Sequence, residues 1–157
     1  MNKALRIATA LSIAVGLAIP AEGIRQVAYR DPGGLLTVCM GSTTDIDPRR
    51  VYSLEECRDR LDRDMLAAVE AVDRCVPDAP ESVLAAFSDA VYNLGERVAC
   101  DRSTSTPARL LAAGDWPAAC EALMLYTKAR IAGVLVELPG LVKRRAMERD
   151  VCLAGLL

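Results

Sequence analysis

The sequence predicts an α+β domain that is mainly helical, with a small β-hairpin lobe and a larger helical lobe. Within residues 29–47, one short apolar run lies between glycines, which is typical of a strand. From Ser53 onward, apolar side chains recur every three or four residues, as in helices that pack on a core. The chain has 157 residues, of which 52% are hydrophobic and 25% charged, enough for one globular domain with its own core.

Composition excludes several classes of function. The net charge is −2, whereas nucleic-acid binding requires clustered Lys and Arg. The chain contains no histidine, which removes imidazole acid–base schemes, Ser-His triads and His-metal sites. Any proton transfer must therefore use carboxyl groups, Tyr, Lys or Cys.

The N-terminal residues 1–21 form a basic and then apolar segment that is typical of membrane export. Lys3 and Arg6 are followed by an uncharged run from Ile7 to Ala21. These 15 residues would span roughly 22 Å as a helix, short of the roughly 30 Å hydrocarbon core. A cleaved signal peptide and an ordinary buried helix remain alternatives, although Pro20 beside the small-residue site disfavours cleavage. We place the folded domain at residues 22–157.

Two carboxyl groups and a hydroxyl follow this segment at Glu22, Asp31 and Thr37. Glu22 comes after the apolar run, a setting that disfavours ionisation and keeps a carboxyl protonated. Asp31 precedes the turn signal Pro32-Gly33-Gly34, so we expect it to be solvated and ionised. Two carboxyl groups in unlike environments are what hydrolysis of a glycosidic bond requires. Two solvated surface carboxylates are the alternative.

The predicted strand, residues 35–40, would form a small hairpin at one wall of a cleft, with Asp31 and Thr37 directed towards Glu22. From here the pattern becomes helical. Ser53 to Glu56 has the form of a capping box and opens a helix that runs to about Cys75. Its predicted buried stripe comprises Leu54, Cys57, Leu61, Met65 and Ala68.

Four further helices follow in the predicted order. Prolines at 77 and 80 separate the first helix from one over residues 81–94, which Gly95 ends as a C-cap. We expect short helices over residues 103–113 and 116–127, with Gly114-Asp115 between them as stop and N-cap. A looser stretch then reaches Leu138, and a last helix covers residues 141–152.

Six cysteines, none before residue 39, indicate structural disulfides in an oxidising compartment. None has the CxxC spacing of a zinc ribbon or redox motif, so we expect no metal. Six cysteines allow 15 pairings, and free buried thiols in a cytosolic protein are the alternative. We expect the pairs that close loops between neighbouring elements: Cys39–Cys57, Cys75–Cys100 and Cys120–Cys152.

The stretch from Glu22 to Gly41, EGIRxxxYRDxxGxxTVCxG, resembles the phage-type lysozymes (glycoside hydrolase family 24), and among them the endolysins of lambdoid phages. The resemblance implies a lysozyme-like fold, with residues 22–157 as the catalytic domain. It implies Glu22 as the general acid, Asp31 as the residue that positions water or stabilises charge, and Thr37 as a second support for that water.

Two later segments also resemble this family. Residues 91–95, VYNLG, match a helix end that faces the cleft, which makes Asn93 either a substrate contact or a helix cap. Residues 140–145 match a Gly-Leu-x-x-Arg-Arg run, whose Arg144 and Arg145 either contact the sugar–peptide backbone or pair with Glu148; we favour the structural role.

The chain also departs from the family pattern. Ser42 stands where the family has His, Leu36 replaces a common aromatic residue, and Tyr126-Thr127 replaces Trp-Thr. We expect these changes to affect the stability of the domain and the stacking of sugars on the cleft before they affect the chemistry.

The resemblance extends to the N-terminal segment, which is similar to a signal-anchor-release segment. Such a segment exports the enzyme uncleaved, tethers it to the host inner membrane, and then leaves the bilayer for the periplasm. No cysteine lies in the segment, so we expect refolding of the helix, rather than disulfide exchange, to be the switch.

We therefore expect an endolysin, a muramidase that cleaves the β-1,4 bond between N-acetylmuramic acid and N-acetylglucosamine for host cell lysis. Its partners would be peptidoglycan and, before release, the inner membrane, with no cofactor, no nucleic acid and a monomeric state. The alternatives are a weak or inactive glycan-binding periplasmic protein on the same fold, and a lytic transglycosylase.

Overall fold

The computed structural model describes residues 2–157; Met1, the first residue of the predicted export segment, lies outside them. Helices predominate and two small antiparallel hairpins accompany them, which confirms the predicted α+β class. In chain order the elements are α1 (Lys3–Glu22), β1 (Arg25–Arg30), β2 (Leu36–Cys39), α2 (Leu54–Cys75), α3 (Glu81–Leu94), α4 (Arg97–Cys100), α5 (Thr106–Ala113), α6 (Trp116–Ala122), the 3₁₀ turn η1 (Leu123–Leu125), β3 (Lys128–Ile131), β4 (Val134–Glu137) and α7 (Pro139–Ala154).

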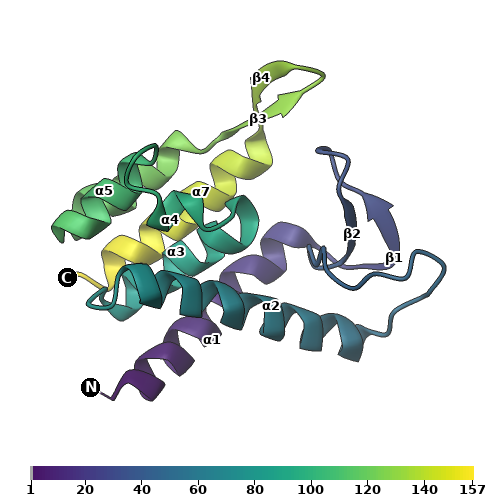
Figure 1. Cartoon of the computed structure of the whole chain (residues 1–157), viewed down its shortest axis with the longest axis horizontal. Coiled ribbons are helices and arrows are strands. Elements are labelled where there is room, and N and C mark those ends of the chain that lie inside the picture. Colours follow the sequence, from purple (N-terminus) through teal and green to yellow (C-terminus); the bar gives the residue numbers. More distant parts are fainter. Residues whose placement is uncertain (1) are drawn as a thin grey trace.

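Helix α3 lies at the centre of the molecule and packs against α1, α2 and α7 (Figure 1). Every residue from Ser82 to Val91 is buried, as expected for a helix that is covered on all sides. Three side chains of this buried stretch are polar, and the first, Ser82, donates to the Cys152 carbonyl at 3.0 Å. The Ser88 hydroxyl donates to the Leu84 carbonyl at 2.6 Å, and Asp89 binds a cation from α7.

Helix α1 lies on α3 and α2 through small side chains. Ala10, Ala14 and Ala18 repeat every four residues and are fully buried, so the helix backbones approach closely. At its start, Arg6 donates to the Ala79 carbonyl at 2.7 Å and pairs with the buried carboxylate of Asp73 on α2. By length and composition α1 could also cross a membrane, a test that soluble core helices and signal sequences pass as well.

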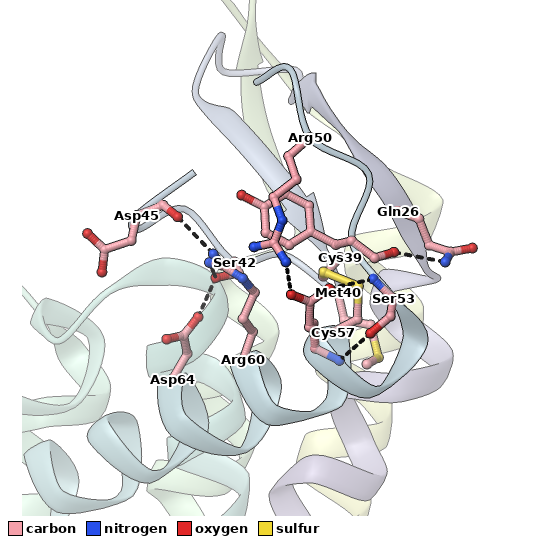
Figure 2. The surroundings of a disulfide bond; sticks show 12 residues. Gln26, Cys39, Met40, Ser42, Asp45, Arg50, Ser53, Cys57, Arg60 and Asp64 are labelled. Carbon is pink, nitrogen blue, oxygen red and sulfur yellow. Dashed lines mark hydrogen bonds and ion pairs between the residues drawn. A yellow bond between two sulfur atoms is a disulfide. The ribbon is translucent and has the colours of Figure 1, made fainter. Parts of the chain in front are cut away.

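The hairpin β1–β2 follows α1 directly and carries the second predicted carboxyl at its turn. Tyr29 pairs with Thr37 and Arg30 with Leu36. The first strand begins at Arg25, earlier than the predicted β region at residue 29. The disulfide Cys39–Cys57 attaches the end of β2 to the first turns of α2 (Figure 2).

The predicted start of α2 is confirmed in detail. The Ser53 side chain accepts from the Glu56 N–H, and the Glu56 carboxylate accepts from the Ser53 N–H, which completes the capping box. Four residues of the predicted stripe are buried, but the prediction was wrong for Leu54, whose side chain is half exposed. Leu54 is the first helical residue, so it lies beyond the edge of the core.

Several boundaries differ from the predicted ones. Helix α5 begins at Thr106 rather than Ser103, α6 ends at Ala122 before a 3₁₀ turn, and α7 already begins at Pro139. The short α4 was not predicted.

The largest difference is the hairpin β3–β4, in the stretch predicted to lack regular structure. Its turn residues Ala132 and Gly133 both have positive φ, at 47° and 82°. Such a turn favours Asn or Gly at its first position, so Ala132 hides it from sequence reasoning. Every residue of β4 is exposed, so burial imposes no alternation on its side chains.

All three predicted disulfides are present: Cys39–Cys57, Cys75–Cys100 and Cys120–Cys152. The third connects α6 to α7, and the second connects the end of α2 to α4. Each contributes about 3–4 kcal/mol for loops of this length.

Candidate active site

A cleft of about 460 Å³ lies between the β1–β2 hairpin and the C-terminal turn of α3. A volume of this size is within the usual range for small-ligand sites. The four predicted site residues Glu22, Asp31, Thr37 and Asn93 all line it, although 71 positions separate the first from the last. The cleft is completed by Tyr29, Pro32, Leu35, Gly41, Thr43, Val91, Tyr92 and Gly95.

The Glu22 carboxyl lies at the last helical position of α1, and its side chain is 18% exposed. Gly23 follows with a φ of 66°, which turns the chain out of the helix towards β1. The carboxyl packs directly on Gly41, where an added Cβ would lie 3.1 Å from both Cδ and Oε2 of Glu22. A glycine at 41 is therefore a condition for this position of the acid.

Arg144 of α7 connects the Glu22 carboxyl to the interior. Its Nη1 donates to Glu22 Oε1, while Nε and Nη2 donate to the two oxygens of Asp89 at 2.9 and 2.8 Å. Burial opposes the charge on this guanidinium, yet the hydrogen bonds and charge of Asp89, together with Glu22, raise the pKa of Arg144. The two-bond contact with Asp89 fixes the plane of the guanidinium, and thus the side of Glu22 that it contacts.

The predicted pairing of the arginines with Glu148 is confirmed for Arg145, whose Nη2 lies 2.5 Å from Glu148 Oε1. Both side chains are fully buried. Glu148 Oε1 also lies 3.6 Å from Arg144 Nε. Burial raises the pKa of Glu148, as does Asp89, and the two guanidiniums oppose that shift.

Asp31 is held by the turn of the β1–β2 hairpin. Its Oδ1 accepts from the Leu35 N–H at 2.8 Å, and its carbonyl accepts from the Gly34 N–H at 2.8 Å. Two residues after Leu35, in β2, the buried Thr37 hydroxyl donates to the Leu35 carbonyl at 3.0 Å. Because Thr37 gives away its proton in this bond, the lone pairs of its oxygen remain available to a ligand.

Tyr92 connects the floor of the cleft to the hairpin lobe. Its hydroxyl donates to the Met40 carbonyl at 2.6 Å, directly before Gly41. Burial and then the charge of Glu22 raise the pKa of Tyr92, so it stays a hydrogen-bond donor at any working pH. The bond keeps Gly41 against the acid.

Two further cavities extend the cleft into a groove. A space of about 410 Å³ shares Gly41, Thr43 and Tyr92 with it and continues past Asp64. On the other side, a space of about 420 Å³ shares Glu22 and Asn93 and continues to the start of α7. Glu22 therefore lies along an elongated groove rather than at the end of a closed pocket.

Asn93 lies where two of these spaces meet. Among residues 2–157, its buried Oδ1 has no hydrogen-bond partner. The helix end is satisfied without it, because the Gly95 N–H donates to the Val91 carbonyl at 2.7 Å. Of the two predicted roles, this geometry favours the substrate contact.

Ser42, the residue that departs from the family pattern, is almost fully buried beneath the groove. Its hydroxyl donates to Asp64 at 2.7 Å, and Arg60 lies beside it (Figure 2). A hydrogen bond from a hydroxyl to a carboxyl group thus connects the hairpin lobe to α2 at this place.

Sequence reasoning missed the links from Glu22 to Arg144, Gly41 and Tyr92, and the role of Asp89. One signal was available for Asp89. An acid within the apolar run from Val83 to Val91 is rarely buried without a cation, so the pattern demanded a partner on another helix.

Comparison with known proteins shows that the chain is similar to phage lysozymes and endolysins. The family model described as phage lysozyme matches residues 20–148. The SAR-endolysin of bacteriophage PS119 is 38% identical over 136 residues, which cover 85% of this chain and 77% of that protein.

Solved structures agree with the sequence relatives. The active form of the P1 phage endolysin Lyz matches with a TM-score of 0.77 at 23% identity, over 100% of this chain and 96% of that one. Its secreted inactive form matches with a TM-score of 0.60 at 19% identity, over 95% and 96%. The muramidase domain of SpmX from Asticaccaulis excentricus gives 0.77 at 27% identity, over 89% of this chain and 94% of that one.

Proposed function

Because this chain belongs to the phage lysozyme family and is a lysozyme-type hydrolase with a muramidase role in cell lysis, we propose that it cleaves the β-1,4 bond between N-acetylmuramic acid and N-acetylglucosamine in peptidoglycan. The observation that carries this proposal is the placement of Glu22 in one cleft with Asp31 and Thr37. The groove on both sides of Glu22 suits a glycan strand that is cut internally.

In the proposed reaction Glu22 is the general acid. It donates its proton to the glycosidic oxygen as the bond to the anomeric carbon breaks, and the leaving sugar keeps that proton as a hydroxyl. Glu22 then carries a negative charge, which the Arg144 contact stabilises. Gly41 and Tyr92 hold the acid in position throughout.

Asp31 and Thr37 hold and orient the attacking water. Asp31 Oδ1 is engaged by the Leu35 N–H, and its second oxygen can accept one proton of a water. The Thr37 oxygen can accept the other, since its own proton is donated to the Leu35 carbonyl. A water held by two acceptors directs a lone pair at the anomeric carbon, and Asp31 takes up the proton that is released.

The N-terminal helix supports a role at the membrane. We place α1 in the inner membrane before release: its 20 residues form a helix about 30 Å long, of which the uncharged run from Ile7 to Ala21 accounts for roughly 22 Å, less than the thickness of the hydrocarbon core. In that state Glu22 lies at the membrane face, away from Asp31. Docking of α1 onto α3 in the periplasm brings the acid into the cleft, and the monomer is then the active species.

Product analysis on purified peptidoglycan tests the proposed reaction. We expect reducing N-acetylmuramic acid ends, which borohydride converts to muramitol. Products with 1,6-anhydro ends would instead indicate a lytic transglycosylase, and binding to the wall without release of fragments would indicate a glycan-binding protein. Either result contradicts the proposal.

Mass spectrometry of the exported protein tests the membrane step. We expect the periplasmic form to retain residues 1–21, with a membrane-bound pool that decreases as the soluble pool grows. A periplasmic protein that begins at or after Ala21 would show cleavage, and α1 could not then be a releasable anchor.

A further inference from the structure

The phenol ring of Tyr29 lies on the hairpin wall of the cleft, and the proposed reaction does not use it. In the β1–β2 ladder Tyr29 stands directly opposite Thr37. Directly opposite residues of an antiparallel pair point to the same face of the sheet, so the ring lies beside the Thr37 side chain. Tyr29, Asp31 and Thr37 all line the cleft. The ring therefore belongs to the side of the cleft that binds the attacking water.

An arginine on the same strand supports the ring. The guanidinium carbon of Arg25 lies 4.3 Å from the centroid of the Tyr29 ring, a cation–π distance. Arg25 is exposed and does not line the cleft, so it covers one face of the ring from outside. A ring that is already held in this way loses little freedom when a ligand packs on it.

The Tyr29 hydroxyl is available to a ligand. The chain has four tyrosines. The hydroxyls of the other three each form a hydrogen bond within the fold: Tyr52 with the Asp47 N–H, Tyr92 with the Met40 carbonyl and Tyr126 with the Ser105 hydroxyl. Within residues 2–157, the Tyr29 hydroxyl has no such partner. Burial and then the charge of Glu22 raise the pKa of Tyr29, so the hydroxyl keeps its proton and can donate it to a ligand oxygen.

Few aromatic side chains could serve a sugar in this cleft. The chain has one Trp, four Tyr and one Phe, and among the described residues only Tyr29 and Tyr92 line the cleft. The Tyr92 hydroxyl is already bound to the Met40 carbonyl. Leu36, which replaces a common aromatic residue of the family, does not line the cleft. Tyr29 is therefore the aromatic residue with both a supported ring and an unused hydroxyl, the combination of apolar body and polar tip that suits a sugar.

The position of Tyr29 indicates which sugar it binds. In the proposed reaction, the water held by Asp31 and Thr37 attacks the anomeric carbon of N-acetylmuramic acid. That carbon must lie next to the water, on the side of the cleft that carries Tyr29. We propose that Tyr29 is a substrate-binding residue, whose ring packs on this N-acetylmuramic acid and whose hydroxyl donates to one of its oxygens. This inference rests on the proposed function.

Two substitutions separate the ring from the hydroxyl. Tyr29→Phe removes only the hydroxyl and should raise KM on solubilised glycan strands about fivefold, the effect of one neutral hydrogen bond. Tyr29→Leu also removes the ring, and we expect KM to rise about twentyfold. In both variants kcat should stay within about threefold of wild type, because a contact made equally in the ground state and the transition state changes KM alone.

Tyr52→Phe is the matched control. Tyr52 belongs to the same lobe, and the guanidiniums of Arg50 and Arg60 lie over its ring at 4.8 and 4.7 Å. It lines none of the three spaces of the groove, so we expect the wild-type KM. A wild-type KM in either Tyr29 variant overturns the proposal. A fall in kcat without a rise in KM also overturns it, because the ring would then support the reacting groups rather than hold the sugar.

A binding measurement covers the case in which a Tyr29 variant does not fold. In Glu22→Gln, titration with a tetrasaccharide of alternating N-acetylglucosamine and N-acetylmuramic acid should shift the NMR signals of the Tyr29 ring and leave those of Tyr52 in place. Tyr29 signals that do not move in excess tetrasaccharide overturn the inference. The proposed function fails separately, when the wild-type protein releases 1,6-anhydro ends or no fragments, whereas failure of this inference leaves the reducing ends of the wild-type products unchanged.

Discussion

Replacement of Asp73 by asparagine tests how α1, and with it Glu22, is held on the folded domain. Asp73 lies on α2 with its side chain 5% exposed, and it receives two cations from the start of α1. Arg6 is mostly buried beside it, whereas Lys3 is 70% exposed. The two residues that give the N-terminal segment its basic flank are thus the ones that fasten α1 in the folded protein.

The magnitude follows from burial. Removal of one partner of a buried pair costs about 3–5 kcal/mol because the other charge is left uncompensated. Arg6 keeps its bond to the Ala79 carbonyl and asparagine still accepts one hydrogen bond, so we expect the low end, about 3 kcal/mol. Lys3→Ala removes an exposed pair and should cost at most about 1 kcal/mol.

Denaturant unfolding of the purified protein measures both changes, with Asp62→Asn on the exposed side of α2 as the matched control. Arg6 and Glu22 are 16 residues apart, about 24 Å along the helix, so Asp73→Asn leaves the chemistry of the docked form intact. The loss should appear in stability and in the fraction of active molecules. An Asp73→Asn protein within 0.5 kcal/mol of the Asp62→Asn control would refute the reasoning.

Three further changes have expected outcomes. Gly41→Ala places a Cβ 3.1 Å from the Glu22 carboxyl at a φ of 94°, so we expect it to lower the muralytic rate at least about tenfold, whereas a wild-type rate would show that the acid is held otherwise. Gly16→Ala meets nothing within 4 Å on an exposed face of α1 and should raise the free energy of unfolding by about 0.5–1 kcal/mol; a loss would mean that this face is packed. Replacement of Cys75 and Cys100 by serine opens a 25-residue loop and should lower the free energy of unfolding, measured by calorimetry, by about 3.5 kcal/mol. An unchanged free energy of unfolding would mean that the unfolded chain is already constrained without this disulfide.

The parts of the fold that the sequence predicted correctly are those with local signals. The capping box at Ser53, the stop and N-cap at Gly114-Asp115 and the turn after Asp31 each depend on residues within a few positions. The cysteine pairs were accessible because each joins one cysteine to the next cysteine along the chain.

The hairpin β3–β4 was hidden for the opposite reason. It projects from the body, so its apolar side chains are exposed and show no alternation that a buried face would impose (Figure 1). At the first position of its turn, Ala132 stands where Asn or Gly usually indicates a positive φ. The strand pairing is stabilised locally and leaves little trace in the pattern.

The site residues show the same contrast between local and distant signals. The three residues of the N-terminal motif lie within 16 positions, and a local pattern identified them. The partner of the acid, Arg144, lies 122 positions away from Glu22 and was predicted in a structural role, because nothing in its own segment indicates which helix it faces. Contacts that depend on the packing of α1, α3 and α7 become visible only in three dimensions.

The most direct test of the account is the muralytic rate of Glu22→Gln on purified peptidoglycan, beside Glu55→Gln on the exposed side of α2 as the matched control. Both proteins should fold, and the account predicts a drop of about 10²- to 10⁴-fold for Glu22→Gln with a wild-type rate for Glu55→Gln. A folded Glu22→Gln protein that digests the wall as fast as the control would contradict the role of Glu22 as the proton donor.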